Sequence, residues 1–444
     1  MEGKPTAVPE TAKQEGEAES KWEWAEPSVW TKRMLTALEE GVKGGVWFSL
    51  IDKVGSKKNL AAAARRVIRN KGSAGIDRVN VEQYQRRLET NLEEIRREIH
   101  ESRYEPKAVK RVMIPKGNGK ERPLGIPTVK DRVVQTALRQ VIEPIFEKEF
   151  MPMSYGFRPG RGCKQALKGM SELINGGHIW IVDADIKSYF DSIPHEKLRR
   201  QVREKIADGR VLKMIELFLK QGVMDGIKEW TPEEGTPQGA VISPLLANIY
   251  LHPFDREMAE EGYQMIRYAD DFVIMCRTEE EAQRALTGVK EWMQEAGLKL
   301  SDEKTRIVNM SEEGEWMEFL GYHFEKCRGR VIHWPRKKSL MKMKDAIREK
   351  TRRCNGHGIG WIIQKVNAIL RGWYGYYKQS HWTTFKGIDQ WIRMRLRSIL
   401  RKRAGRRGIG HGWDNIRWPN SYFEDNGLFS LVGAYEAIVS PPKR

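Results

Sequence analysis

The sequence predicts an α+β domain up to about residue 324, followed by a basic and mostly helical segment. Three observations lead to this fold class. Short apolar runs bounded by glycine and proline alternate with stretches of helical periodicity over residues 59–324. Two of these apolar runs end in aspartate. Between Gly321 and Gly410 the chain has 24 Lys and Arg against 4 Asp and Glu, so this segment accounts for the entire net charge of +18.

The first 130 residues predict a tail, helices and a hairpin. Residues 1–27 are rich in Glu and poor in apolar side chains, which is typical of a disordered acidic tail. Helical spacing begins near Trp30 and returns over residues 59–70, and a glycine-containing turn follows. Residues 111–115 and 122–127 each predict an extended segment. Residues 116–120 between them have the composition of a hairpin turn. No function follows for residues 30–55.

The central part of the chain predicts the framework of the α+β domain. Helical periodicity covers residues 131–150 and is expected again from Pro194 and over residues 244–250. The continuous apolar run over residues 178–185 predicts a buried strand. Residues 265–276 predict two strands joined by a tight turn. A helix should then begin at Thr278 and end at Gly297, since Thr with Glu281 three residues later forms a capping box and Gly suits a helix end.

Length and composition exclude several classes of protein. A chain of 444 residues predicts two or three domains. It contains no apolar run of about 20 residues and no signal-peptide pattern at its start, so no membrane partner is expected. Its four cysteines form no Cys-x-x-Cys pair and are too few for a disulfide framework. A cytoplasmic location is the expectation.

The basic segment favours nucleic acid as the partner. Lys and Arg bind phosphates, and the aromatic side chains interleaved with them can stack on bases. The alternative is a solvated helical surface with the aromatics in a small core. The charge excess is too one-sided for a neutral surface, so we favour nucleic acid while expecting several aromatics to be buried. These aromatics are Trp361, Trp373, Tyr374, Tyr376, Tyr377, Trp382 and Trp391.

Three aspartates are candidate ligands for metal ions. Asp270 and Asp271 lie at the predicted turn between two apolar segments, and Asp185 ends a third apolar run. Two adjacent acids at a hairpin tip are common on protein surfaces, which is the alternative. If the ends of neighbouring strands meet, however, these carboxylates can bind Mg²⁺, which prefers oxygen ligands. Two such ions about 4 Å apart can activate a 3′-hydroxyl and stabilise a leaving pyrophosphate.

These motifs together resemble those of reverse transcriptases, and their order resembles the group II intron-encoded subfamily most. The resemblance covers about residues 59–405. It is carried by Arg122-Pro-Leu-Gly-Ile-Pro127, Tyr155-Gly-Phe-Arg-Pro159, Asp185-Ile-Lys-Ser-Tyr-Phe-Asp191, Thr236-Pro-Gln-Gly-Ala-Val-Ile-Ser-Pro-Leu-Leu-Ala-Asn248, Tyr268-Ala-Asp-Asp271, Gly297-Leu-Lys-Leu-Ser-Asp-Glu-Lys304, Phe319-Leu-Gly-Tyr322 and Gly372-Trp-Tyr-Gly-Tyr-Tyr377. A single motif is weak evidence, but the ordered set is specific.

The resemblance implies a right-hand polymerase fold. Residues 28–180 would form an N-terminal extension and the fingers, and residues 181–324 the palm with the catalytic acids. Residues 325–410 would form a basic helical thumb or maturase domain. Residues 411–444 would be a C-terminal tail, and its segment 417–423 either packs on the thumb or is a remnant that contacts DNA. This tail has one histidine and no cysteine, so it does not encode the endonuclease found in many relatives.

The resemblance also implies roles for single residues. Asp185 and Asp270 would bind both metal ions, with the Ile186 carbonyl as a further ligand and Asp271 more peripheral. Phe190 would exclude a 2′-hydroxyl, or it packs in the core. Lys304 is a candidate general acid for pyrophosphate, or simply a charged residue at a helix end. The residues expected to bind the nucleotide are Lys116, Arg122, Phe190, Gln238 and Gly239, of which Lys116 and Arg122 could instead be ordinary solvated cations.

The implied function is an RNA-directed DNA polymerase that binds its intron RNA and assists splicing and retrohoming. Its partners would be structured intron RNA, an RNA template with a DNA primer, and dNTPs, with two Mg²⁺ ions as cofactors. One alternative is a splicing-only RNA-binding maturase, which the intact acids disfavour. The other is a reverse transcriptase captured by the host for DNA repair or phage defence. The sequence does not indicate an oligomeric state.

Overall fold

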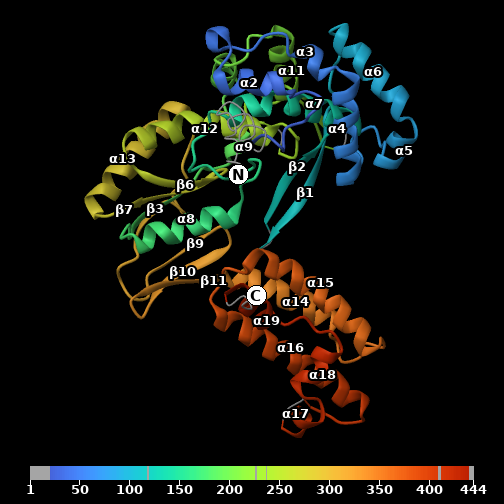
Figure 1. The fold of residues 1–444 in the computed structure, drawn as a ribbon, viewed down its shortest axis with the longest axis vertical. Helices are drawn as coiled ribbons and strands as arrows, with labels where there is room; N and C mark the ends of the chain where they lie inside the picture. The colour runs from blue at the N-terminus through green and yellow to red at the C-terminus, as the bar shows by residue number, and fades with distance from the viewer. Residues whose placement is uncertain (1–20, 118–119, 226–227, 237, 409–411, 440–444) are drawn as a thin grey trace, which may run out of the picture. The chain divides into compact units, whose positions relative to one another are not determined.

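The computed structural model describes residues 21–117, 120–225, 228–236, 238–408 and 412–439. Its chain divides into two compact units (Figure 1). The first unit comprises residues 1–166 and 182–306, and the second comprises residues 167–181 and 307–444. The predicted domain boundaries at residues 27, 180, 324 and 410 stay predictions. The division into two compact units follows packing contacts and does not test these boundaries. Among the described residues, every helix is too short or too polar to cross a bilayer.

The first half of the chain contains eleven helical elements and three strands within the described residues. They are α2 (Lys32–Glu40), η1 (Lys43–Gly45), α3 (Ile51–Val54), α4 (Lys57–Asn70), α5 (Val81–Arg86), α6 (Leu88–His100), β1 (Val109–Gly117), β2 (Lys120–Ile126), α7 (Val129–Glu147), α8 (Cys163–Asn175), β3 (Trp180–Asp185), α9 (Tyr189–Ser192), α10 (His195–Arg203) and α11 (Gly209–Leu219).

The second half begins with two short strands and ends with helices. Its described elements are β4 (Val223–Asp225), β5 (Lys228–Trp230), α12 (Ser243–Glu260), β6 (Gln264–Tyr268), β7 (Asp271–Cys276), α13 (Glu279–Ala296), β8 (Arg306–Asn309), β9 (Trp316–Phe319), β10 (Tyr322–Cys327), β11 (Arg330–Pro335), α14 (Lys337–Lys350), α15 (Ile359–Tyr377), α16 (Trp382–Arg403), α17 (Trp413–Arg417), α18 (Asn420–Asp425) and α19 (Leu431–Val439).

A four-stranded sheet in the first unit includes the predicted hairpin. Its strand order is β2-β1-β4-β5, with β1 antiparallel to β2 and parallel to β4. The glycine-rich residues between the two apolar segments explain why β1 and β2 pair as a hairpin. Beside this hairpin in the chain, α7 is buried along most of its length, and α4 packs against it. Asn59 of α4 donates a hydrogen bond from Nδ2 to the Ala137 carbonyl at 3.1 Å.

A second sheet in the first unit has β7 between β6 and β3. Both α12 and α13 pack on it, and the rings of Phe254, Phe272 and Trp292 meet between them. The predicted N-cap and C-terminal glycine of α13 are confirmed, because Thr278 Oγ1 accepts from the Glu281 backbone N–H and Gly297 ends the helix at φ 75°. The Glu281 carboxylate accepts from the Arg277 N–H at 2.8 Å, one residue before the N–H that a capping box uses. This packing fixes the ends of β3, β6 and β7, where the three candidate aspartates lie.

The second unit combines a three-stranded sheet with helices. Its antiparallel sheet has the order β11-β10-β9. The basic segment from Gly321 to Gly410 is mostly helical, as predicted, but it also contains β10 and β11, which were not predicted from the sequence. Tyr322 explains part of the difference, since its buried ring packs against those of Tyr376 and Tyr377 on α15 and favours a strand that faces the helix.

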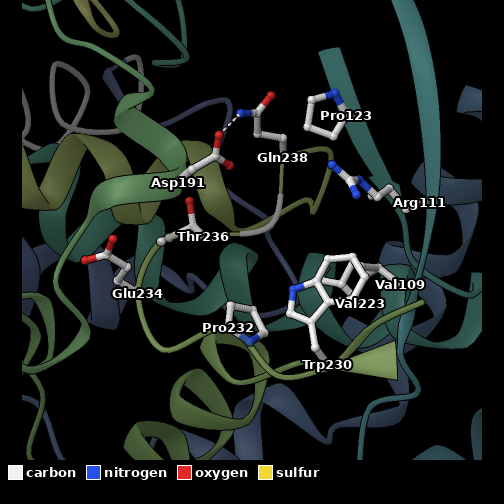
Figure 2. A pocket seen from close by; sticks show the side chains of 12 residues that line it. Val109, Arg111, Pro123, Asp191, Val223, Trp230, Pro232, Glu234, Thr236 and Gln238 are labelled. Carbon is white, nitrogen blue, oxygen red and sulfur yellow. Dashed lines mark hydrogen bonds between the residues drawn. The ribbon is translucent and has the colours of Figure 1, made fainter. Parts of the chain in front are cut away.

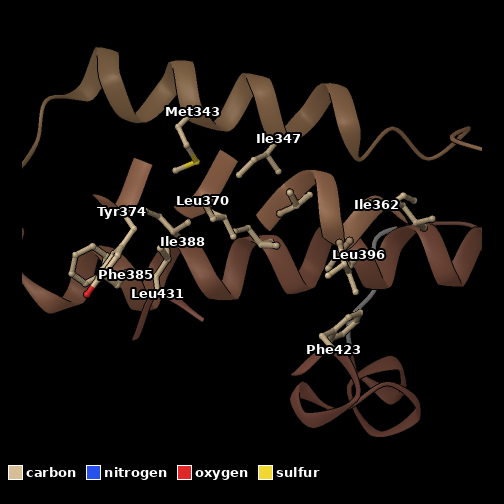
Figure 3. Close-up of a cluster of buried hydrophobic side chains, with 14 residues drawn as sticks. Met343, Ile347, Ile362, Leu370, Tyr374, Phe385, Ile388, Leu396, Phe423 and Leu431 are labelled. Atoms are coloured by element: carbon tan, nitrogen blue, oxygen red, sulfur yellow. The ribbon is translucent and has the colours of Figure 1, made fainter. Parts of the chain in front are cut away.

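One buried cluster joins α14, α15, α16 and the last helices (Figure 3). Phe423 of α18 and Leu431 of α19 are fully buried in it. Asp389 of α16 accepts hydrogen bonds from the backbone N–H groups of Leu431 and Val432, so it caps the start of α19. The sequence left open whether the C-terminal tail packs on the helical domain or contacts DNA. The structure shows this packing, and DNA contact stays a prediction.

Disorder was predicted for residues 1–27, and for residues 21–27 this prediction is wrong. Residues 1–20 lie outside the described residues. Trp22 and Ala25 are buried. Trp22 donates a hydrogen bond from Nε1 to Glu39 Oε1 at 2.5 Å, and Lys21 forms an ion pair with the same carboxylate at 2.9 Å. The tryptophans supply enough apolar surface to order this part of an otherwise polar segment.

Candidate active site

The three candidate aspartates gather at one edge of the sheet formed by β6, β7 and β3. Asp185 ends β3, whereas Asp270 lies in the β6–β7 turn and Asp271 begins β7. Asp185 lies close enough to both acids of the turn to raise the pKa of the Asp271 carboxyl and that of Asp270. The structure therefore brings together all three acids that the sequence selected.

Burial and mutual repulsion change the acidity of these aspartates. Although the residue as a whole is exposed, desolvation of the Asp271 carboxyl raises its pKa, and the neighbouring Asp185 and Asp270 add to the shift, to about 7. Desolvation and the charge of Asp185 also raise the pKa of Asp270. Both shifts have the same cause, which is that crowded negative charges in a partly desolvated place favour protonation. Such a place also favours a bound cation.

Lys304 lies at this acidic edge. Its Nζ donates a hydrogen bond to Asp185 Oδ2 at 2.6 Å. Burial lowers the pKa of Lys304, but the bond to Asp185 and the charges of the three aspartates outweigh it and raise the pKa. Backbone pairing explains this position, because the N–H of Ser301 bonds to the Asp185 carbonyl at 2.8 Å and a turn then leads to Lys304. The Lys304 ammonium therefore places a positive charge beside the carboxylates, which is also where a metal ion would place one.

A buried arginine holds the β6–β7 turn through hydrogen bonds. Arg267 is fully buried and forms an ion pair with Asp255, whose side chain is equally buried. Its guanidinium also donates to the Ala269 carbonyl at 2.9 Å, to Asn248 Oδ1 at 3.1 Å and to Ser154 Oγ at 2.8 Å. These bonds satisfy a charge that would otherwise be costly to bury. They also hold the turn, in which Ala269 has a left-handed φ of 61°.

Gly156 lets a neighbouring segment lie against the same turn. A Cβ at this position would lie 2.3 Å from the Ala269 nitrogen, so no larger residue fits without moving the turn. The Gly156 carbonyl accepts a hydrogen bond from Asn248 Nδ2 at 2.8 Å. The motif Tyr155-Gly-Phe-Arg-Pro159 thus has a physical role, because it fixes the position of the two aspartates in the turn.

The candidate nucleotide-binding residues differ in how the structure places them. Phe190 is the second residue of α9. The centroid of its ring lies 5.6 Å from that of Tyr189 and 6.3 Å from that of Phe157. Arg122 is exposed on β2. Lys116 lies on β1, but its side chain is outside the described part of the structure. None of these contacts tests the nucleotide-binding roles, which stay predictions.

Gln238 and Gly239 lie against the hairpin strand β2. The N–H of Gly125 donates to the Gln238 carbonyl at 2.7 Å. Gly239 has φ 105°, and a Cβ there would lie 2.5 Å from the Gly125 carbonyl oxygen, so this close approach of two backbones requires glycine. Ile186 is buried, and it forms an isolated bridge with Leu300. The structure gives no test of its carbonyl as a ligand.

The donor set fits divalent cations, although the described residues include no group of three or more His, Cys, Asp or Glu already spaced to hold one. Carboxylates are the ligands preferred by hard cations such as Mg²⁺. The proposed ligands are present at the strand ends, and Asp185 accepts a hydrogen bond from Lys304. The raised carboxyl pKa values indicate uncompensated negative charge, which is the electrostatic condition for such a site.

The supporting roles of several residues were not predicted from the sequence, although Gly156 and Asn248 belong to motifs that carry the resemblance. Arg267, Asp255, Asn248 and Gly156 form the support of the turn, and Asp183 lies two residues before Asp185 on β3. Desolvation raises the pKa of Asp183 to about 6, with Asp185 adding to the shift. The one available signal was a charged residue, Arg267, inside an otherwise apolar strand, which implies a buried partner. The partner's identity is not encoded locally.

Sequence comparisons agree with this geometry. The profile of the reverse transcriptase (RNA-dependent DNA polymerase) family matches residues 114–324, and that of the group II intron maturase-specific domain matches residues 340–416. Protein YkfC of Escherichia coli K12 is 35% identical over 312 residues, which are 61% of this chain and 81% of YkfC.

Two further relatives are named for introns. Group II intron-encoded protein LtrA of Lactococcus lactis subsp. cremoris is 33% identical over 310 residues, which are 55% of this chain and 51% of LtrA. An uncharacterized 91 kDa protein in the cob intron of Schizosaccharomyces pombe is 44% identical over 146 residues, which are 33% of this chain and 18% of that protein. The matched region thus spans about half of LtrA and most of YkfC.

Proposed function

The chain belongs to the reverse transcriptases encoded by group II introns, which join an RNA-directed DNA polymerase to a maturase domain, and from this premise we propose how its residues act. Its partners are nucleic acids, and enzymes of this family use divalent metal ions. We propose that the ions are two Mg²⁺ and that the chain copies RNA into DNA at the edge formed by Asp185, Asp270 and Asp271. The observation that carries this proposal is the convergence of the three carboxylates.

The carboxylates would hold the ions, with Asp185 and Asp270 in contact with both and Asp271 more peripheral. Bound Mg²⁺ supplies the positive charge that lowers the pKa of the primer 3′-hydroxyl and stabilises the leaving pyrophosphate. The Ile186 carbonyl is proposed as a further ligand. The network around Arg267 keeps the β6–β7 turn in place, so the ligands are positioned before substrate binds.

Lys304 is proposed to donate a proton to the pyrophosphate as it leaves. Its ammonium already lies at the carboxylates, 2.6 Å from Asp185 Oδ2. The arrival of metal ions would compete for the same carboxylate and release the lysine toward the phosphates. Lys116 and Arg122 on the β1–β2 hairpin are proposed to hold the triphosphate. Arginine can do so through two parallel hydrogen bonds.

The second unit is proposed to bind the intron RNA, assist its splicing and support retrohoming. Its basic character supports this proposal, since 24 of the 90 residues from Gly321 to Gly410 are Lys or Arg. Several of these cations lie over aromatic rings, for example Lys365 Nζ at 5.4 Å from the Trp361 centroid and Lys386 Nζ at 5.6 Å from that of Trp382. Such pairs present charge and a stacking surface together.

The polymerase proposal is tested with an Asp270→Ala variant in primer extension on an RNA template with Mg²⁺ and dNTPs. Loss of a proposed ligand to both ions should abolish synthesis, whereas binding of RNA should remain close to that of the unchanged protein because the second unit is intact. Asp425→Ala, at an exposed acid that ends α18, serves as the matched control and should extend the primer normally. If the Asp270 variant still synthesised DNA, the site assignment would be wrong.

A further inference from the structure

The loop that contains Gln238 is fixed by contacts on both sides. On one side, the N–H of Thr236 bonds to the Phe190 carbonyl, and the N–H of Gly235 bonds to the Ile193 carbonyl at 2.8 Å. On the other side, the Gln238 carbonyl accepts from Gly125 of β2 at 2.7 Å. These bonds hold Gly235 and Thr236 beside α9, and Gln238 beside β2. These backbone bonds do not determine which end of the Gln238 side-chain amide points in which direction.

Asp191 lies next to that amide. Gln238 Nε2 donates a hydrogen bond to Asp191 Oδ2 at 2.7 Å, although 47 residues separate the two in the chain. Both line a cavity of about 300 Å³ between the sheet that contains β1 and β2 and the loop before α12 (Figure 2). Its apolar walls include Trp230 and Pro123, and Asp191 and Gln238 contribute polar groups.

The chemistry of the two groups determines how the amide points. An amide has one end that donates and one end that accepts, and the two ends have nearly the same shape. An ionised carboxylate only accepts hydrogen bonds, so the NH₂ end of Gln238 must face Asp191. Its carbonyl oxygen then points away from Asp191, as Figure 2 shows. Without the carboxylate, the amide could turn over at little cost.

We propose that Asp191 is a positioning residue, which fixes the Gln238 amide so that its carbonyl oxygen faces the incoming nucleotide as a hydrogen-bond acceptor. This inference rests on the proposed function, because it requires that nucleotides bind beside Phe190 and Gln238. Asp191 follows Phe190 directly, so the residue proposed to select the sugar and the residue that orients Gln238 lie on one short helix, α9. Asp191 itself need not touch the substrate.

The test is primer extension on RNA, with kcat and KM for the dNTP determined for Asp191→Ala, Asp191→Asn, Gln238→Ala and the double Ala variant. Loss of a hydrogen bond to a charged acceptor predicts a rise in KM of about tenfold for Asp191→Ala, with kcat changed by about twofold or less. Asp191→Asn keeps the size of the side chain but can present either end of its own amide, so it should leave the Gln238 amide free to turn over and should raise KM as well. Glu204→Ala, which removes an exposed carboxylate at the end of α10 outside the cavity, is the matched control and should leave KM unchanged.

The double variant distinguishes positioning from other roles. If Asp191 acts through Gln238, the double variant should have the KM of Gln238→Ala alone, because the second change then removes nothing more. Two additive effects, or a fall in kcat at constant KM, would overturn the inference while leaving the polymerase proposal intact. Asp191→Asn keeps the packing, so an unfolded Ala variant does not remove the test. If the unchanged protein itself failed to extend a primer, the proposed function would fall and the inference with it.

Discussion

At the scale of single residues, the acids at the sheet edge are unusual because their pKa values are raised where a cation is proposed to bind. Asp270, Asp271 and Asp183 all show this shift, and desolvation is the largest cause for each. The cost of keeping these carboxylates ionised in the metal-free protein is compensated when a cation binds. A strained site of this kind is typical of function rather than of stability.

Asp271 makes metal binding depend on pH. Its carboxyl has a pKa raised to about 7, so it is mostly protonated below this pH and mostly ionised above it. Because only the ionised form binds Mg²⁺, metal affinity should fall as the pH drops through about 7, by up to about tenfold per pH unit. Calorimetric titration of the protein with Mg²⁺ at several pH values measures this slope. Asp271→Asn should flatten it, and an unchanged slope in that variant would contradict the assignment.

Phe190 should control the choice between deoxynucleotides and ribonucleotides. Its ring lies in a small aromatic group with Tyr189 and Phe157, which limits its movement. Phe190→Ala should raise the ratio of ribonucleotide to deoxynucleotide incorporation by roughly tenfold or more, because space for a 2′-hydroxyl opens. Competition assays with labelled nucleotides give this ratio. Phe190→Tyr retains the ring and should keep the preference, and an unaltered ratio in the Ala variant would favour simple core packing.

At the scale of elements, the β6–β7 hairpin depends on residues from other parts of the chain. The turn is held by Arg267 with Asp255 and Asn248 of α12, and it is approached by the segment around Gly156. A two-strand hairpin alone would not fix two carboxylates in one position. The position of the site therefore follows from how α12 and the segment before α8 pack on the hairpin.

Gly156→Ala should damage catalysis without touching an acid. The new Cβ would lie 2.3 Å from the Ala269 nitrogen, so the turn must move. A displacement of the catalytic groups by about 1 Å can lower the rate about a hundredfold, and a loss of kcat of this order is expected in primer extension. Gly162→Ala in the same segment is the control, because nothing lies within 4 Å of its added Cβ. Equal activity of the two variants would refute the role given to Gly156.

At the scale of the whole molecule, charge and chemistry are separated along the chain. The acids of the proposed active site belong to the first unit, and most of the excess positive charge belongs to the second. The second unit keeps its charge on a bundle whose core includes Phe423 and Leu431 from the C-terminal tail. Removing this tail should therefore weaken the basic bundle, even if the tail never contacts nucleic acid.

Binding of RNA should be sensitive to salt. If about 6 phosphates of single-stranded RNA are neutralised, log K should fall with log salt at a slope near −4. Filter binding or fluorescence anisotropy at several salt concentrations gives the slope. Replacing the exposed Arg352 and Arg353 with Gln should reduce its magnitude by about 1.4 if both contact phosphate. A flat salt response of the unchanged protein would contradict the electrostatic role of the second unit.

The sequence by itself determined the α+β class, the main helices and strands, the three aspartates and the basic segment, because these depend on local periodicity, capping and composition. Thr278 and Gly297, for example, define α13 through contacts within a few residues. Only the tertiary structure decided which groups support the site. Arg267 with Asp255, Gly156 with Ala269, and Asp191 with Gln238 meet through packing of distant segments. No local pattern encodes such pairs, because their energy depends on burial and on partners that folding alone brings together.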